Sequence, residues 1–284
     1  MAANLYPQGM TLHSIGYAAL KYPALPPELP IPLGNQLGVL QRTPLPIQIR
    51  IMAHVASQYL PALLEYQYSD APHLHDPTSS QYWCSDAFTL INWLTSSPDA
   101  AVAVAKHPSL FPDTVAKLLD PNILTAMKAC TRQGGASFEA DLGSMLQFVS
   151  TLLLRKEHLP DTPHLHDLLP KLKAWKRKFG GLFIARVADR LADQIRSPGN
   201  ADFAVVLSAQ NENLVCGFVG CEEKRNLNAC ARCQMQRYCG QAHQKSDWGF
   251  HKKICGKGLV EEWKRGGSWY SGIFTVSGLG LSWV

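Results

Sequence analysis

Apolar residues recur at helical spacing through the middle of the chain. In the stretch 46–66 they predict an amphipathic helix with a break or kink at Pro61, because proline lacks the N–H that a helix needs. Its apolar face is formed by Ile49, Met52, Val55, Leu60, Leu63 and Leu64. Similar patterns predict helices in 82–97, 98–107, 112–120, 121–130, 138–158, 166–179 and 181–198. Strand-like alternation is scarce, so we expect an all-helical domain at 46–210.

The two ends of the chain have a different pattern. Residues 1–45 are rich in proline and predict an N-terminal arm of extended, polyproline-like chain. Residues 259–284 alternate apolar and small residues near their end, which predicts a tail with a short β-hairpin that packs on the body. The expected fold class is therefore mainly α, with a small cysteine-rich module between the helical domain and the tail.

Composition adds few restrictions. The 284 residues are 46% hydrophobic and 17% charged, which is enough to form a hydrophobic core without disulfides. The formal net charge of +5 is only mildly basic. The sequence has no apolar run of membrane-spanning length and no secretory signal pattern, so we expect an intracellular protein of the nucleus or cytoplasm. In that compartment clustered cysteines are typical of metal sites.

Six of the eight cysteines and two histidines lie between 216 and 255, in the order C-x4-C-x8-C-x2-C-x5-C-x3-H-x7-H-x3-C. Eight ligands suffice for two four-coordinate Zn²⁺ ions with no open position, which is typical of structural zinc. Spacing alone allows a sequential and an interleaved assignment. The sequential assignment gives the first ion Cys216, Cys221, Cys230 and Cys233, and the second ion Cys239, His243, His251 and Cys255.

The same residues carry a resemblance. The run CARC, the pair Tyr238–Cys239, and the closing Trp248, His251 and Cys255 resemble a MYND-type zinc finger, in the variant frequent in fungal proteins. We assign the finger to 211–258. The resemblance implies interleaved ligands: Cys216, Cys221, Cys239 and His243 for one zinc, and Cys230, Cys233, His251 and Cys255 for the other. The chain departs from the family pattern by four residues between the first two cysteines and by histidine as the sixth ligand.

The resemblance also implies a function. MYND-type fingers are protein-interaction modules that bind proline-containing peptides of the form Pro-x-Leu-x-Pro, and Gln244 and Trp248 stand at the positions expected to contact them. We therefore expect a zinc-dependent adaptor linked to transcriptional regulation. The segment Pro23–Pro27, PALPP, matches the peptide pattern, which leads to the hypothesis that the N-terminal arm binds the finger of its own or a second copy.

Two further interpretations concern DNA and catalysis. Seven basic and three acidic side chains, six thiolates and two Zn²⁺ give 216–255 a formal charge of +2, so direct contact with DNA is the less favoured alternative. The chain lacks the motifs of a SET methyltransferase domain and of common nucleotide-binding, hydrolase and metalloprotease sites, and we expect no enzyme activity. The run Lys171–Phe179 predicts an amphipathic helix whose basic face is either solvated or binds an acidic partner.

Overall fold

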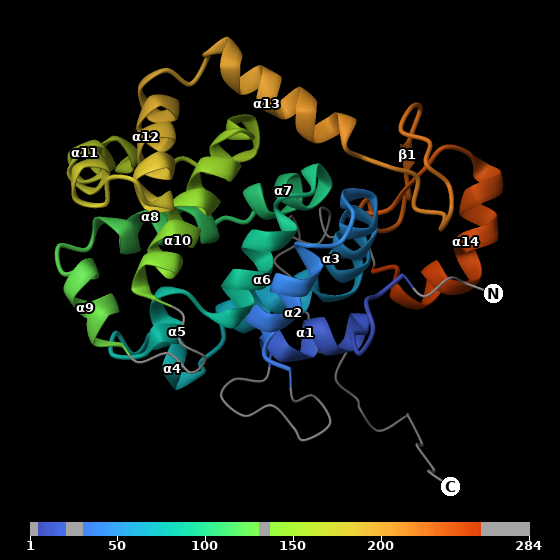
Figure 1. The fold of residues 1–284 in the computed structure, drawn as a ribbon, viewed down its shortest axis with the longest axis horizontal. Coiled ribbons are helices and arrows are strands. Elements are labelled where there is room, and N and C mark those ends of the chain that lie inside the picture. The colour runs from blue at the N-terminus through green and yellow to red at the C-terminus, as the bar shows by residue number, and fades with distance from the viewer. Residues whose placement is uncertain (1–4, 21–30, 131–136, 257–284) are drawn as a thin grey trace, which may run out of the picture.

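The structure is a computed structural model that describes residues 5–20, 31–130 and 137–256. It is mainly α-helical, with one small two-stranded sheet in the described part of the chain. Helices α1–α12 form a helical body, and residues 215–256, which we call the finger, lie at one end of it (Figure 1). None of the described helices combines the length and the apolarity that crossing a bilayer requires.

The elements follow one another along the chain with short connections. The α-helices of the body are α1 (Leu12–Leu20), α2 (Leu33–Leu40), α3 (Leu45–Gln67), α4 (Pro72–His75), α5 (Ser80–Trp83), α6 (Asp86–Leu94), α7 (Pro98–Ala105), α8 (Leu110–Leu119), α9 (Ile123–Ala129), α10 (Phe138–Leu153), α11 (Leu168–Lys178) and α12 (Phe183–Arg196). Short 3₁₀ turns are η1 (Lys156–His158) and η2 (Leu165–Asp167). The remaining elements are α13 (Ala201–Glu212), β1 (Asn228–Ala229), β2 (Arg237–Tyr238) and α14 (Gln241–Ile254).

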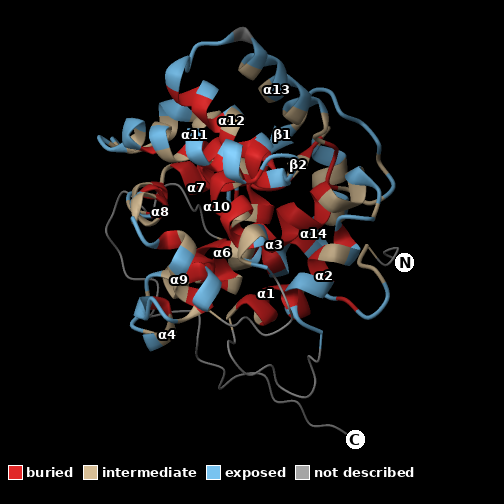
Figure 2. Ribbon diagram, turned by 60° about the vertical axis from the view of Figure 1, so that its left-hand side comes forward, coloured by how far each residue is buried: buried red, intermediate tan, exposed pale blue. Residues whose placement is uncertain are grey.

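Helix α3 is the centre of the body. Every residue from Ile49 to Ser57 is buried, and the helix packs against α1 and α6 (Figure 2). A helix with apolar residues on most sides needs such neighbours around it. A second group of helices forms where α12 packs against α10 and α11. Helix α13 connects this group to the finger and is largely exposed (Figures 1 and 2).

The helix predicted over 82–97 begins at Asp86, after the short helix α5. Ser85 is its N-cap, and the Oγ of Ser85 accepts a hydrogen bond from the backbone N–H of Phe88 at 2.8 Å. Helix α7 begins with Pro98 in the first turn, where the missing N–H has no cost. The prediction of an amphipathic helix over Lys171–Phe179 is confirmed, since Leu172 and Trp175 of α11 and the C-cap residue Phe179 are buried among exposed basic side chains.

The prediction of an extended N-terminal arm is wrong for two segments of 1–45. Helices α1 and α2 occupy Leu12–Leu20 and Leu33–Leu40, and both belong to the core through residues such as Ile15 and Leu40. The prolines of 1–45 lie outside these two helices, and Pro32 and Pro44 are the N-cap residues of α2 and α3. At these two positions proline marks a helix boundary rather than extended chain.

Helix α3 continues through Pro61, where the sequence predicted a break or kink. Proline has no N–H to donate to the carbonyl four residues earlier, which is that of Ser57. In the structure the backbone N–H of Gly256 donates to this carbonyl at 3.2 Å. The backbone N–H of Gly256, the residue after the last cysteine of the finger, thus takes the place of the missing N–H of Pro61.

Two hypotheses concern residues outside the described part of the chain. The Pro23–Pro27 segment lies in 21–30, and the tail with its predicted hairpin lies in 257–284.

Candidate metal centre

The first pair of cysteines lies in a loop in which two glycines allow four residues to fit between the ligands. Cys216 and Cys221 enclose Gly217, Phe218, Val219 and Gly220. A Cβ at Gly217 would lie 2.0 Å from Nε2 of Gln236, so only glycine lets the loop approach that side chain. Gly220 has a φ of +87°, a conformation that side chains disfavour, and it turns the chain back to Cys221. The longer spacing therefore still closes a metal loop.

The remaining ligands come from a hairpin and a helix. Strands β1 and β2 are antiparallel, with Ala229 opposite Arg237, so Cys230 follows β1 at the turn end of the hairpin and Cys239 follows β2 at the opposite end. The loop that follows Cys230 contains Cys233, and Gln234 N–H donates to Cys230 O at 2.8 Å. Cys239 precedes α14, whereas His243, His251 and Cys255 lie in its first turn, its last turn and its C-cap.

The structure brings these eight residues together as two separate groups of four. One group contains Cys216, Cys221, Cys239 and His243, and the other contains Cys230, Cys233, His251 and Cys255. Within each group all ligand atoms lie within 4.8 Å of one another. The grouping is the interleaved arrangement, in which each ion takes one pair from the loops before α14 and one pair from the segment of α14.

The distances within each group fit a tetrahedral zinc ion. Zn–S bonds of about 2.3 Å and Zn–N bonds of about 2.0 Å set the edges of such a tetrahedron at roughly 3.8 Å between sulfurs and 3.5 Å between sulfur and nitrogen. The structure has 3.8 Å for Cys221 Sγ–Cys239 Sγ and for Cys230 Sγ–Cys255 Sγ. Cys233 Sγ lies 3.6 Å from His251 Nε2, and Cys216 Sγ lies 3.6 Å from His243 Nδ1. Cys239 Sγ lies 3.1 Å from His243 Nδ1, which is shorter than the tetrahedral edge. Both groups accordingly hold structural Zn²⁺.

Electrostatics explain why these groups need a cation. Burial, together with the neighbouring Cys216 and Cys221, raises the pKa of Cys239 to about 11. Burial and the neighbouring Cys233 and Cys230 raise the pKa of Cys255 above its ordinary value. Zinc binds thiolates and removes their protons, so a divalent ion at each centre converts mutual repulsion into bonding.

The two zinc sites differ in exposure. All four ligands of the Cys230 group are buried, whereas Cys221, Cys239 and His243 of the other group are only half-buried. His243 Nδ1 faces the cysteines, and its ring stacks on Phe218 with 4.7 Å between centroids. The histidine at the unusual position is thus placed as a ligand, and an aromatic side chain fixes its plane.

This difference predicts two rates of zinc release. With excess chelator, one equivalent of zinc leaves faster, from the half-exposed site of Cys221, Cys239 and His243, because solvent and chelator reach it first. A colorimetric zinc indicator follows the release in stopped-flow. In Cys239→Ser we expect the fast phase to disappear and the slow phase to remain. Loss of the slow phase instead would contradict the assignment.

Arg50 of α3 joins the helical body to the first zinc loop. Its guanidinium is buried, with 6% of the residue exposed, and Nε donates to the carbonyl oxygen of Cys216 at 3.0 Å. A second guanidinium nitrogen donates to the carbonyl oxygen of Cys221. One arginine therefore holds both ends of the Cys216–Cys221 loop, which fixes the backbone from which two zinc ligands project.

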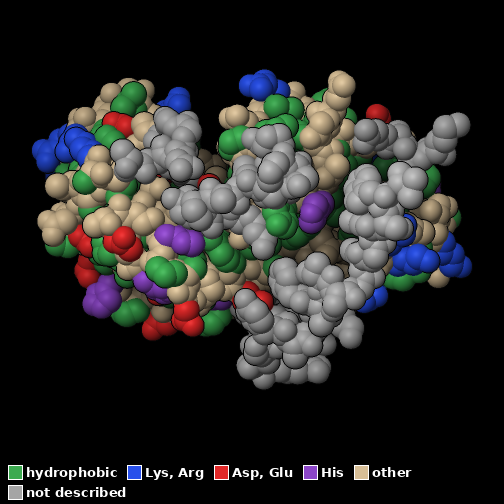
Figure 3. Space-filling view, turned by 90° about the horizontal axis from the view of Figure 1, so that it is seen from below, with side chains coloured by type: hydrophobic (Ala, Val, Ile, Leu, Met, Phe, Trp, Pro, Cys, Tyr) green, Lys and Arg blue, Asp and Glu red, His purple; other side chains and the backbone are tan. Residues whose placement is uncertain are grey.

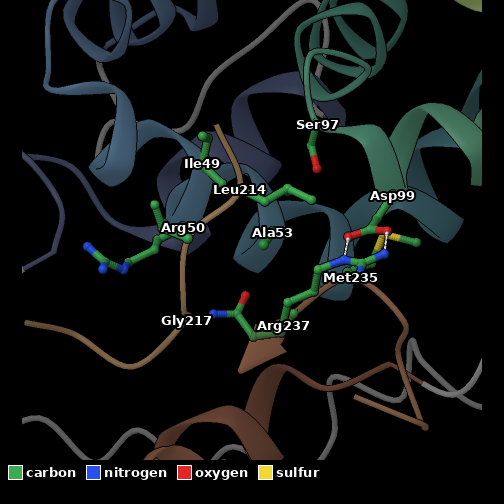
Figure 4. A pocket seen from close by; sticks show the side chains of 11 residues that line it. Ile49, Arg50, Ala53, Ser97, Asp99, Leu214, Gly217, Met235 and Arg237 are labelled. Atoms are coloured by element: carbon green, nitrogen blue, oxygen red, sulfur yellow. Dashed lines mark hydrogen bonds and ion pairs between the residues drawn. The ribbon is translucent and has the colours of Figure 1, made fainter. Parts of the chain in front are cut away.

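A second contact joins the finger to α7. Arg237 of β2 forms two hydrogen bonds of 2.6 Å with the carboxylate of Asp99, one to each oxygen (Figure 4). The bidentate pair borders a cavity of about 10 Å³ between α3, α7 and the finger, which has room for about one water molecule. Arg50 and Asp99 could not be identified from the sequence, because both are distant from the cysteines along the chain and lie in ordinary helical patterns.

The predicted peptide-contacting residues lie on α14. Trp248 is 40% exposed, and its ring centroid lies 5.9 Å from that of the zinc ligand His251. Gln244 stands one turn earlier and is half-buried, and its side chain has no hydrogen bond among the described residues. An aromatic side chain and an amide thus lie four residues apart on α14, and the aromatic one is next to the buried zinc site.

Fold and site together define a helical protein with a C-terminal, two-zinc, interleaved finger. Residues 215–255 match the family model of the MYND finger, a protein-interaction domain, and this part of the chain is a MYND-type zinc finger. The match covers the finger and leaves the helical body outside it. No solved structure matches the chain.

Proposed function

We propose that the protein is a zinc-dependent adaptor whose finger binds short proline-containing segments of partner proteins, of the Pro-x-Leu-x-Pro kind, at the surface of Gln244 and Trp248. The observation that supports this proposal is the exposure of Trp248, since its large aromatic ring offers an apolar platform on the surface of the finger. The unpaired amide of Gln244 stands beside it and supplies a donor and an acceptor for a peptide backbone.

The proposed ligand suits such a surface. A proline-rich peptide is already extended in solution, so it loses little conformational entropy when it binds. It can cover the Trp248 ring with an apolar side chain while Gln244 fixes its direction. Zinc enters this function indirectly, because His251 and Cys255 hold the C-terminal end of α14 and His243 holds its start.

A binding titration tests the proposal. The zinc-loaded full chain is titrated into a fluorescein-labelled Pro-x-Leu-x-Pro peptide and followed by fluorescence polarisation. We expect Trp248→Ala to weaken binding by about 2 kcal/mol, roughly 30-fold in Kd, as for an aromatic hot spot. Gln244→Ala should weaken it less. Lys252→Ala, an exposed change on the same helix, serves as the control. Equal binding by wild type and Trp248→Ala would refute the proposed surface.

The proposal also includes the kind of partner. We propose that the proteins bound by the finger act in transcriptional regulation and that this protein itself catalyses no reaction. If zinc-stripped protein still binds the peptide, the binding site lies in the helical body rather than in the finger. The formal charge of +2 for residues 216–255 gives direct DNA binding no support.

A further inference from the structure

Helices α11 and α12 concentrate the positive charge of the protein. Residues 168–196 contain eight basic and two acidic side chains, which give a formal charge of +6. The whole chain has +5, so all other residues together have a formal charge of −1. Charge this localised is unusual for a merely solvated surface, where both signs are interspersed.

Half of these basic side chains already have partners. Lys176 pairs with Asp189 and Arg196 with Asp193, whereas Lys171 and Arg190 donate to oxygens of the body. The other four are exposed and form no ion pair among the described residues. They are Lys173, Arg177, Lys178 and Arg186.

Two exposed apolar side chains lie within the same segment. Leu182 is 50% exposed and Phe183 is 46% exposed, in the connection between α11 and α12 and at the first residue of α12. The Phe183 ring lies close to Gly143 of α10, where a Cβ would be only 3.0 Å from its Cδ1. The ring is therefore held in position while much of it faces solvent.

The start of α12 adds to the positive field. Its N-cap, Leu182, makes no side-chain cap, and its first turn has no acidic residue. The free N–H groups at this end attract negative charge, and Arg186 in the same turn adds to this attraction. Cations in the last turn of α11 also stabilise that helix, but this role does not account for Lys173, for Arg186 or for the exposed leucine and phenylalanine.

We propose that residues 173–186, which we call the basic surface, bind an acidic segment of a partner protein that also carries apolar side chains. Carboxylates pair with the four free cations, and the apolar side chains cover Leu182 and Phe183. Nucleic acid suits the surface less well. Typical phosphate-tracking sites make about six to ten phosphate contacts, and exposed leucine and phenylalanine have no use against a phosphate backbone.

The basic surface lies far from the finger. Figure 1 places α11 and α12 at the end of the molecule opposite α14, and Figure 3 shows Lys and Arg side chains gathered at that left-hand end. A partner bound there leaves the Trp248 surface free. The protein can then bind two different proteins at once, one at each end. The proposal for the basic surface itself does not depend on whether the finger binds proline-containing peptides.

A labelled peptide tests the proposal with the zinc-loaded full chain. The probe is a fluorescein-labelled 16-residue peptide in which Asp and Glu alternate with Leu and Phe. We expect measurable binding that weakens as salt rises, and about tenfold weaker binding by the double variant Arg177→Glu, Arg186→Glu. Leu182→Ser should also weaken binding, although serine is a better N-cap than leucine and should not harm α12. Arg42→Glu, exposed and outside the basic surface, should bind like wild type.

Three comparisons decide against the alternatives. A peptide with Ser in place of Leu and Phe should bind more weakly, and equal binding would remove the apolar part of the proposal. Tighter binding of a 20-base-pair DNA duplex, or of vesicles containing phosphatidylserine, would overturn it in favour of nucleic acid or a lipid surface. Absence of peptide binding at millimolar concentration would overturn it outright. Circular dichroism and zinc content establish that each variant is folded.

Discussion

Removal of both zinc ions is expected to unfold the finger and to destabilise the helical body without unfolding it. Structural zinc supplies about 10–16 kcal/mol of apparent binding free energy in small modules, far more than the few apolar side chains of 215–256 provide. The body has its own core around α3, α6 and α10, so its helices persist. It loses the acceptors of Arg50 and the Arg237–Asp99 pair, which we expect to cost about 5 kcal/mol, or roughly 10–20 °C in Tm.

Hydrogen exchange and circular dichroism measure these effects. Chelation should abolish amide protection in α14 and speed exchange around residues 50–57 of α3, while most ellipticity at 222 nm remains. Readdition of Zn²⁺ serves as the control and should restore both. Complete loss of helical signal on chelation would show that the body cannot fold without the finger, and an unchanged Tm would show that the contacts of Arg50 and Asp99 add no stability.

Among single substitutions, we expect Arg50→Met to have the largest effect on the contact between the helical body and the finger. Methionine keeps much of the buried volume but leaves the carbonyl oxygens of Cys216 and Cys221 without this donor. Hydrogen bonds to a charged group contribute about 1.5–3 kcal/mol each, so we expect a loss of roughly 3–5 kcal/mol in the free energy of unfolding. Urea unfolding followed by tryptophan fluorescence and by zinc release measures it.

A matched substitution separates this contact from a general effect of losing an arginine. Arg42→Met changes an exposed arginine near the start of α3 and should alter the free energy of unfolding by no more than about 0.5 kcal/mol. Zinc release from the Cys216 group should be faster in Arg50→Met than in Arg42→Met. If the two variants unfold alike, the guanidinium of Arg50 does not stabilise the zinc loop.

The helices of the body could be predicted from apolar spacing because each buries one face against its neighbours. This reasoning identified α11, and it failed for α1 and α2. Both helices are short, and the buried face of α1 includes Gly16 and Ala19, which carry little apolar signal. Helix α2 does bury Leu33, Leu37 and Leu40 at helical spacing, but this signal was outweighed by the prolines around it. The density of proline around them then suggested extended chain.

The zinc ligands could be predicted as a set, because six cysteines and two histidines at this spacing within 40 residues are typical of zinc sites. Spacing could not divide them between two ions, and only the resemblance to MYND-type fingers favoured the interleaved assignment. The contacts that hold the finger to the body could not be predicted at all. Arg50 and Asp99 meet the finger through tertiary packing across more than a hundred residues of sequence.

The central claim about the finger is that its eight ligands are divided between two ions in the interleaved arrangement. Cadmium-113 substitution followed by NMR that correlates each metal with its ligand protons tests it most directly. We predict two cadmium resonances. One should couple to Cys216, Cys221, Cys239 and His243, and the other to Cys230, Cys233, His251 and Cys255. Coupling of a single resonance to Cys239, His243, His251 and Cys255 together would contradict the interleaved arrangement.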